Sequence, residues 1–184
     1  MEAAREVFLE HGAGVATAVV ARRLGVSAAA LFHRFGSKRN LVLRALTPQL
    51  PDFEAIEAGP DARPIPEQLR EIGLEVSQRL RKMGPRMAAL RSAGLSPKDC
   101  FDHFEEPPPL RLHKSLTRWF QLAIEQGRVR PGDAGCYAMA FLGGLNSRHF
   151  FTHFLQVEPE LPQEGFVDSI VDTICAGCLP PEDR

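Results

Sequence analysis

Apolar residues recur along this 184-residue chain three to four positions apart, which is the spacing of an amphipathic α-helix. No stretch of alternating β-branched residues, the pattern of a half-buried strand, interrupts this spacing. Glycine and proline clusters separate the apolar segments, as they do at helix ends. The pattern predicts an all-α protein with helices over residues 2–11, 16–24, 28–33, 38–46, 66–83, 85–94, 97–104, 108–127, 133–156 and 162–178.

Charge divides the chain into a basic N-terminal part and an acidic C-terminal part. Residues 1–46 carry seven Lys or Arg and three acidic side chains, a net charge of +4. Residues 47–184 carry 15 basic and 20 acidic side chains, a net charge of −5. A basic module joined to an acidic one is typical of a polyanion-binding domain fused to a domain of another kind. We therefore predict two domains, residues 1–47 and residues 48–184.

The basic domain contains two short predicted helices, 16–24 and 28–33, joined by a tight turn at Gly25 and Val26. Ser27 follows the turn, and serine is a favoured N-cap. Two helices joined in this way form a helix-turn-helix, whose second helix enters the major groove of DNA. The spacing therefore predicts a three-helix DNA-binding domain that contacts double-stranded DNA.

The same segment resembles the DNA-binding domain of the tetracycline-repressor (TetR) family. The resemblance is carried by Ala21-Arg22-Arg23-Leu24-Gly25-Val26-Ser27, by Leu31-Phe32-His33-Arg34-Phe35, and by Ser37-Lys38 with Leu41. Further along, the run from Ala123 to Asp133, followed by a long helix with Gly143-Gly144, is similar to the end of the family's seventh helix and its dimer-forming eighth helix. The resemblance implies a homodimeric transcriptional regulator that binds operator DNA and a small-molecule effector.

Eight residues are the candidate DNA contacts: Thr17, Ser27, Ala28, Ala29, Phe32, His33, Arg34 and Lys38. We expect Thr17, Ser27 and Lys38 at phosphates, which position a protein on DNA without reading its sequence. His33 and Arg34 are expected at base edges or at the backbone; the alternatives are packing for the histidine and a solvated surface for the arginine.

Two features depart from the family's pattern. Phe32 stands where relatives typically have a tyrosine that gives its hydroxyl to a phosphate. The alanines at positions 28–30 offer methyl groups and no hydrogen bonds, and thymine methyls are their natural partners.

The resemblance also implies an effector cavity among the helices of the second domain. Its candidate walls are the aromatic and methionine side chains Met83, Met87, Phe101, Phe104, Trp119 and Phe120, although such residues at helical spacing are commonly core. This lining favours an apolar or aromatic ligand. The helices 133–156 and 162–178 are apolar enough to pair across a two-fold axis as a four-helix bundle, which predicts a homodimer.

Other patterns point away from catalysis, metals and membranes. The sequence has no nucleophile elbow, phosphate loop or paired carboxylates in context, so we predict no enzyme and no cofactor. Cys175 and Cys178 have CxxC spacing and His149 and His153 stand four apart, but neither pair has further ligands nearby; packing is the favoured interpretation and metal or redox use the alternative. No apolar run is long enough to span a bilayer, so no membrane contact and a cytoplasmic location are expected.

The sequence therefore predicts a ligand-responsive transcriptional regulator, a repressor that binds a palindromic operator as a homodimer. The alternative is a helical small-molecule-binding or interaction protein with weakened DNA binding, which the three alanines and Phe32 favour.

Overall fold

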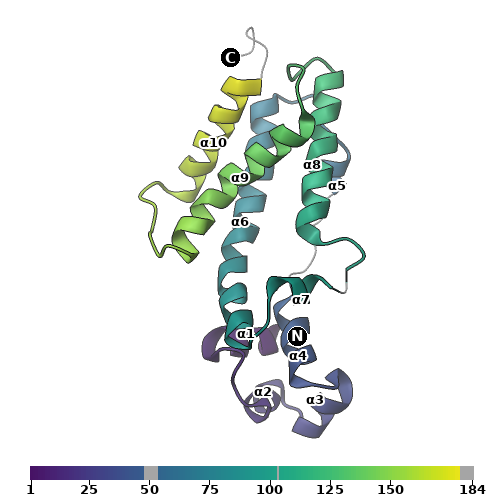
Figure 1. Cartoon of the computed structure of the whole chain (residues 1–184), viewed down its shortest axis with the longest axis vertical. Coiled ribbons are helices and arrows are strands. Elements are labelled where there is room, and N and C mark those ends of the chain that lie inside the picture. The colour runs from purple at the N-terminus through teal and green to yellow at the C-terminus, as the bar shows by residue number, and fades with distance from the viewer. Residues whose placement is uncertain (48–53, 103, 179–184) are drawn as a thin grey trace. The chain divides into compact units, whose positions relative to one another are not determined.

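The structure is a computed structural model, and it describes residues 1–47, 54–102 and 104–178 (Figure 1). Within these ranges the chain consists of helices and the loops between them, with no strand. The predicted all-α fold is confirmed. No helix in the described ranges is both long enough and apolar enough to cross a membrane.

The helices form two compact units. Unit 1 contains Met1–Leu50 with Lys82–Pro107, and unit 2 contains Pro51–Arg81 with Pro108–Arg184. The long helix α6, Ile65–Ser92, contributes to both. The domain boundary after residue 47 stays a prediction, and the packing groups residues 82–107 with the N-terminal helices.

Unit 1 is built from α1 (Glu2–His11), α2 (Thr17–Leu24), α3 (Ala28–Phe35), α4 (Lys38–Leu46), the end of α6, and α7 (Pro97–Phe101). Its core contains Phe8, Leu41 and Leu90, each at most 1% exposed. The buried Arg5 joins α1 to α4, because its Nε donates a 2.9 Å hydrogen bond to the Ala45 carbonyl. This bond satisfies one of the carbonyls that the end of a helix leaves without an intrahelical partner.

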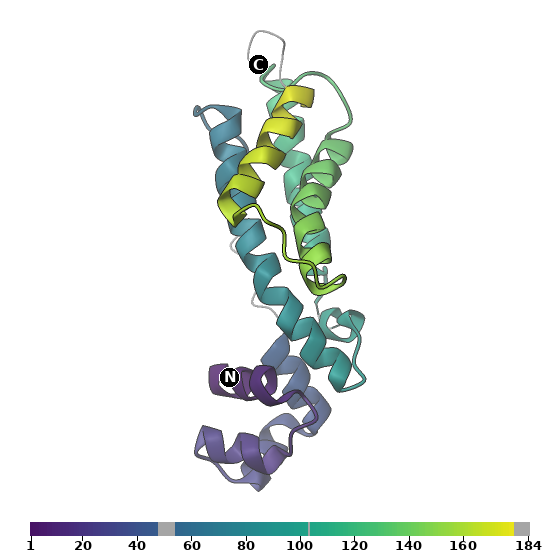
Figure 2. The same ribbon diagram turned by 90° about the vertical axis from the view of Figure 1, so that its left-hand side faces the viewer.

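Unit 2 is built from α5 (Glu54–Glu57), the first part of α6, α8 (Pro108–Glu125), α9 (Ala134–His153) and α10 (Gln163–Cys178). Helix α9 packs against both α8 and α10. In Figure 2, α10 (yellow) faces the viewer, with α6 (blue) on one side and α9 (green) on the other. The core contains Leu69, Leu116, Trp119, Phe120 and Phe141, all at most 1% exposed.

A glycine lets α6 approach its neighbours in unit 2. A Cβ added to Gly73 would lie 2.8 Å from Cγ1 of Val167 on α10 and 3.4 Å from Cζ of Phe141 on α9. The distance to Val167 is too short for ordinary packing, so a side chain at this position would require Val167 or the helices to shift. The face of α6 that carries Gly73 is therefore turned towards α9 and α10.

The sequence predicted a helix break that the structure does not contain, and it did not predict the short helix α5. Gly84-Pro85 predicted a break between helices 66–83 and 85–94, whereas α6 runs without interruption from Ile65 to Ser92 with Pro85 inside it. A proline removes one hydrogen bond from a helix, and packing at either side can offset that loss. Here Leu69 and Leu90, both fully buried, fix the two halves of α6 in the two cores.

Candidate nucleic-acid interface

The turn between α2 and α3 has the geometry that a helix-turn-helix needs. Gly25 ends α2 in the left-handed conformation, with φ 68° and ψ 27°, and its N–H donates to carbonyls of the last turn of α2. A side chain at these angles would be strained, so glycine suits the position. The chain then reverses within two residues and enters α3.

Serine caps fix the first turns of the next two helices. The Oγ of Ser27 accepts a 3.1 Å hydrogen bond from the Ala30 N–H, and the Oγ of Ser37 accepts one of 3.1 Å from the Asn40 N–H. The cap predicted at Ser27 is confirmed, and Ser37 caps α4 in the same way. The N-terminus of a helix presents free N–H groups and a partial positive charge, which favour a phosphate.

Helix α3 is held by one side and exposed on the other. Leu31, 5% exposed, anchors it in the core, and Ala28 packs beside that core. Five of its side chains are exposed to solvent: Ala29, Ala30, Phe32, His33 and Arg34. Phe32 is 49% exposed, which is unusual for an aromatic residue of this size in a small domain. The exposed surface therefore offers methyl groups and an aromatic ring, with hydrogen-bonding groups only at His33 and Arg34.

Three of the predicted DNA contacts come together in a shallow depression. Thr17, Phe32 and Lys38 line it together with Leu31, Ser37 and Leu41. The ammonium of Lys38 donates a 2.7 Å hydrogen bond to the carbonyl oxygen of Gly14, just before α2. An ammonium carries three donors, so this bond holds Lys38 in place and leaves donors for an anion.

A second concave surface was missed by the sequence reasoning. Arg34 and Phe35 of α3, with Asn40, Leu43 and Arg44 of α4, line an open concavity of about 360 Å³. The Arg34 guanidinium lies 5.6 Å from the centre of the Phe35 ring. The four-residue spacing of Asn40 and Arg44 in a predicted helix is a signal that could have found this surface.

The candidate effector walls do not gather in one core. Trp119 and Phe120 are buried in unit 2, whereas Met87 and Phe101 pack against the core of unit 1. Met83 and Phe104 are half-buried in unit 1. Two polar residues of unit 2 that the sequence did not single out, Ser77 and His113, have buried atoms without hydrogen-bond partners among the described residues.

The cysteine and histidine pairs both lie in unit 2. Cys175 and Cys178 are buried in its core; a hydrogen bond between the two thiols raises the pKa of Cys175 and lowers the pKa of Cys178. The rings of His149 and His153 are 4.2 Å apart, and burial, with a smaller contribution from His153, lowers the pKa of His149 to about 4. In the part of the chain that the structure describes, no three His, Cys, Asp or Glu side chains gather as a metal site would require.

The capped helices, the left-handed turn and the exposed α3 define a DNA-binding protein of the helix-turn-helix class. Residues 1–45 match the family model for "Bacterial regulatory proteins, tetR family". This match identifies residues 1–45 as a domain of that family, whose members are transcriptional regulators. No curated protein sequence matches the chain.

Solved structures share the fold over nearly the whole chain. A protein from Mesorhizobium loti, described as a TetR-family transcriptional regulator, is 17% identical with a TM-score of 0.75, over 97% of this chain and 94% of its own. A TetR-family regulator from Pseudomonas syringae is 22% identical with a TM-score of 0.63, over 97% and 94% of the two chains. The complex of SmeT with triclosan is 20% identical with a TM-score of 0.66, over 100% and 91%. These structures share both the N-terminal helix-turn-helix and the helical C-terminal part.

Proposed function

We propose that the protein is a transcriptional repressor that binds a palindromic operator as a homodimer and is released from it by an apolar or aromatic small molecule. The observation that carries the proposal is the exposed surface of α3, a capped helix that follows a left-handed glycine turn. A helix presented in this way can enter the major groove, which is about as wide as a helix. We place the protein in the cytoplasm, with the DNA.

The proposed DNA contacts fall into two groups. Thr17, Ser27 and Lys38 bind phosphates and fix α3 in the groove, a role that the depression and the N-terminal caps support. His33 and Arg34 reach base edges, while Ala28, Ala29 and Phe32 make apolar contacts. Because few of these side chains can form hydrogen bonds, thymine methyls and DNA shape supply much of the selectivity.

Exposed apolar residues on α9 support a homodimer. Met139 is 64% exposed, Phe150 47% and Phe154 66%, and their spacing puts them along one side of the helix and its C-terminal end. Large apolar side chains exposed along one side of a helix are typical of an interaction site, and a two-fold axis would cover them with the same surface of a second copy. Paired subunits place two recognition helices about 34–36 Å apart, the spacing of successive major-groove sites.

The effector binds inside unit 2, where Trp119 and Phe120 belong to the proposed lining of its site. The triclosan complex of a similar structure supports an aromatic effector. A ligand can release DNA only if it binds the DNA-free conformation more tightly than the DNA-bound one. The change that the ligand causes in the free energy of operator binding equals the difference between its binding free energies for the two conformations.

One observation favours a second candidate function. Ala29, Ala30 and Phe32 form no hydrogen bonds to bases, so the chain fits also a helical small-molecule-binding or interaction protein whose DNA contacts have weakened. The two candidates are separated by incubating the purified protein with fragments of genomic DNA from its own source and sequencing those that it retains. The repressor enriches a single inverted repeat; the second candidate enriches no sequence over the input.

A further inference from the structure

Two buried polar atoms in unit 2 have no hydrogen-bond partner among the residues that the structure describes: Oγ of Ser77 on α6 and Nε2 of His113 on α8. Ser77 is 3% exposed, and His113 is half-buried with its Nε2 fully covered. A buried polar atom without a partner loses its bonds to water and gains nothing in return. Such atoms are uncommon in folded proteins, so two in one core call for an explanation.

Ser77 faces α9 from the side of α6. It lies one helical turn after Gly73, and residues four apart share a face of a helix. That face meets α9 closely, because a Cβ on Gly73 would lie 3.4 Å from Cζ of Phe141 and 3.6 Å from Cδ2 of Leu145. The hydroxyl of Ser77 is therefore turned towards the buried side of α9.

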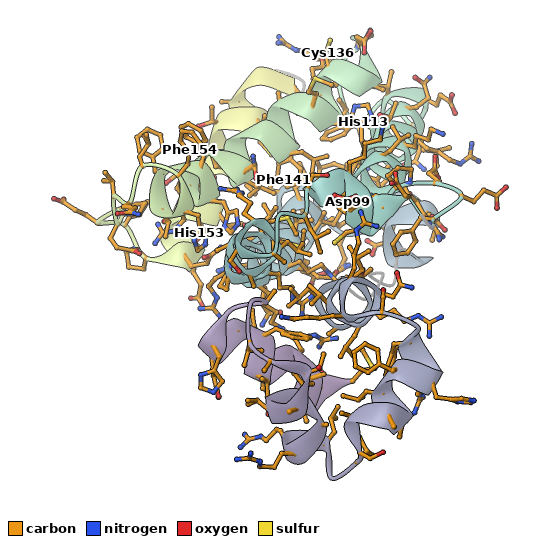
Figure 3. All side chains as sticks on the ribbon, turned by 60° about the horizontal axis from the view of Figure 1, so that its bottom comes forward. Asp99, His113, Cys136, Phe141, His153 and Phe154 are labelled. Atoms are coloured by element: carbon orange, nitrogen blue, oxygen red, sulfur yellow. The ribbon has the colours of Figure 1, made fainter. Side chains whose placement is uncertain are left out.

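His113 faces α9 from the side of α8. It lies one turn before Thr117, whose Cγ2 is 4.0 Å from where a Cβ of Gly135 would be, at the start of α9. Thr117 Oγ1 donates a 2.8 Å hydrogen bond to the His113 carbonyl, which is the normal bond of a threonine in a helix and leaves the imidazole untouched. Figure 3 labels His113 on α8 and Phe141 on α9. Both unpartnered atoms are thus turned towards the buried apolar side of α9, Ser77 from α6 and His113 from α8.

A satisfied serine in the same unit makes the contrast clear. Ser115 is buried like Ser77, at 6% exposed, and sits on α8 two residues after His113. Its Oγ donates to the Arg111 carbonyl, 3.0 Å away, and lies 3.2 Å from Oε1 of Glu57. Burial of a helical serine in unit 2 therefore does not by itself leave the hydroxyl unpartnered.

We propose that Ser77 Oγ and His113 Nε2 are the polar anchors of the effector, and that the effector is a largely apolar, aromatic molecule carrying a hydroxyl group. This inference rests on the proposed function, in which a small molecule binds inside unit 2. A hydroxyl both donates and accepts, so it pairs with a serine hydroxyl and with either tautomer of a neutral imidazole. Ligand sites are commonly apolar with a few placed polar groups that fix orientation. Trp119 and Phe120 supply apolar, aromatic side chains in this core.

The test compares aromatic probes that differ only in the hydroxyl: 4-phenylphenol with biphenyl, and 4-chlorophenol with chlorobenzene. Binding is followed by the fluorescence of Trp119, the one tryptophan of the chain and a member of the same core. Each phenol binds tighter than its partner by about threefold to tenfold per hydrogen bond formed. Ser77→Ala and His113→Phe each reduce that preference, and Ser115→Ala keeps it.

Thermal unfolding of the unliganded protein gives a second readout that needs no ligand. Ser115→Ala breaks existing hydrogen bonds and lowers the Tm by about 2–4 °C. Ser77→Ala removes an atom that has no bond to lose, so the Tm stays the same or rises. A fall in Tm on Ser77→Ala as large as that of Ser115→Ala would mean that the hydroxyl is bonded, and would overturn the proposal.

The proposal is also overturned if neither phenol binds, if both members of each pair bind equally, or if the preference survives in both variants. If any of these results is obtained while specific operator binding is intact, the two residues are not the anchors, and the proposed repressor function is unaffected. The opposite result is that no operator is enriched while the preference for the hydroxyl depends on Ser77 and His113. The proposed repressor function is then wrong, and the protein is a binding protein selective for hydroxyl-bearing ligands.

Discussion

The ammonium of Lys38, in the first turn of α4, donates a 2.7 Å hydrogen bond to the carbonyl of Gly14, just before α2. The bond ties the starts of two helices together beside the depression that Thr17 and Phe32 also line. A phosphate placed there would meet a fixed charge and the N-terminal ends of helices, both of which attract anions.

Replacing this lysine tests the phosphate contact. Lys38→Ala should weaken operator binding about equally for all sequences and reduce the slope of log affinity against log salt by about one unit per subunit, since one phosphate contact is lost. Titrations at several salt concentrations measure the slope. Lys98→Ala, an exposed lysine on α7, is the control and should keep the wild-type slope. An unchanged slope for Lys38→Ala would mean that Lys38 does not contact a phosphate.

Phe32 offers a test by gain of function. Its ring is 49% exposed in the same depression, so a hydroxyl added by Phe32→Tyr meets solvent or DNA rather than the core. We expect operator affinity to rise by about twofold to tenfold per contact formed, the gain from one hydrogen bond, with the Tm unchanged. Weaker operator binding by the tyrosine variant would indicate that the ring itself packs against DNA.

The homodimer depends on α9. Phe150→Glu places a charge in the proposed interface and should raise the dissociation constant at least about 30-fold, as for the loss of an interface hot spot. Sedimentation over a range of concentrations measures the change. Leu9→Glu is the matched control, because Leu9 is also an exposed apolar residue, 41% exposed, but lies on α1. A wild-type protein that sediments as a monomer at micromolar concentration would contradict the prediction.

His149 predicts how stability depends on pH. Burial, with a smaller contribution from His153, lowers its pKa in the folded protein to about 4, below the ordinary value of 6.5. The unfolded chain therefore binds more protons than the folded protein between these values, and the free energy of unfolding should fall as the pH falls from 6.5 to 4. His149→Gln should remove part of this fall, measured by urea unfolding, whereas His11→Gln, on the exposed end of α1, should not. An equal fall in both variants would contradict the assignment.

Much of unit 1 could be predicted from local sequence, because each of its elements has its own signal. Gly25 marks the left-handed turn, and Ser27 and Ser37 cap the helices that follow, as the structure confirms. The helix break predicted at Pro85 was wrong, because the packing that keeps α6 continuous comes from residues far away in sequence. The unpartnered atoms of Ser77 and His113 could not be predicted for a similar reason. Whether a buried polar atom has a hydrogen-bond partner depends on which helices surround it, and local sequence does not determine that arrangement.

The central claim is that α3 reads the operator, with a surface of methyl groups and one aromatic ring. The most direct measurement is the affinity for an operator in which uracil replaces thymine within the half-sites, which removes the methyl groups and keeps the base pairing. A duplex with uracil only outside the half-sites is the control. We predict weaker binding to the first duplex and unchanged binding to the second; equal affinity for both, with a strong preference for hydrogen-bonding groups at the half-site centre, would contradict this placement of the recognition surface.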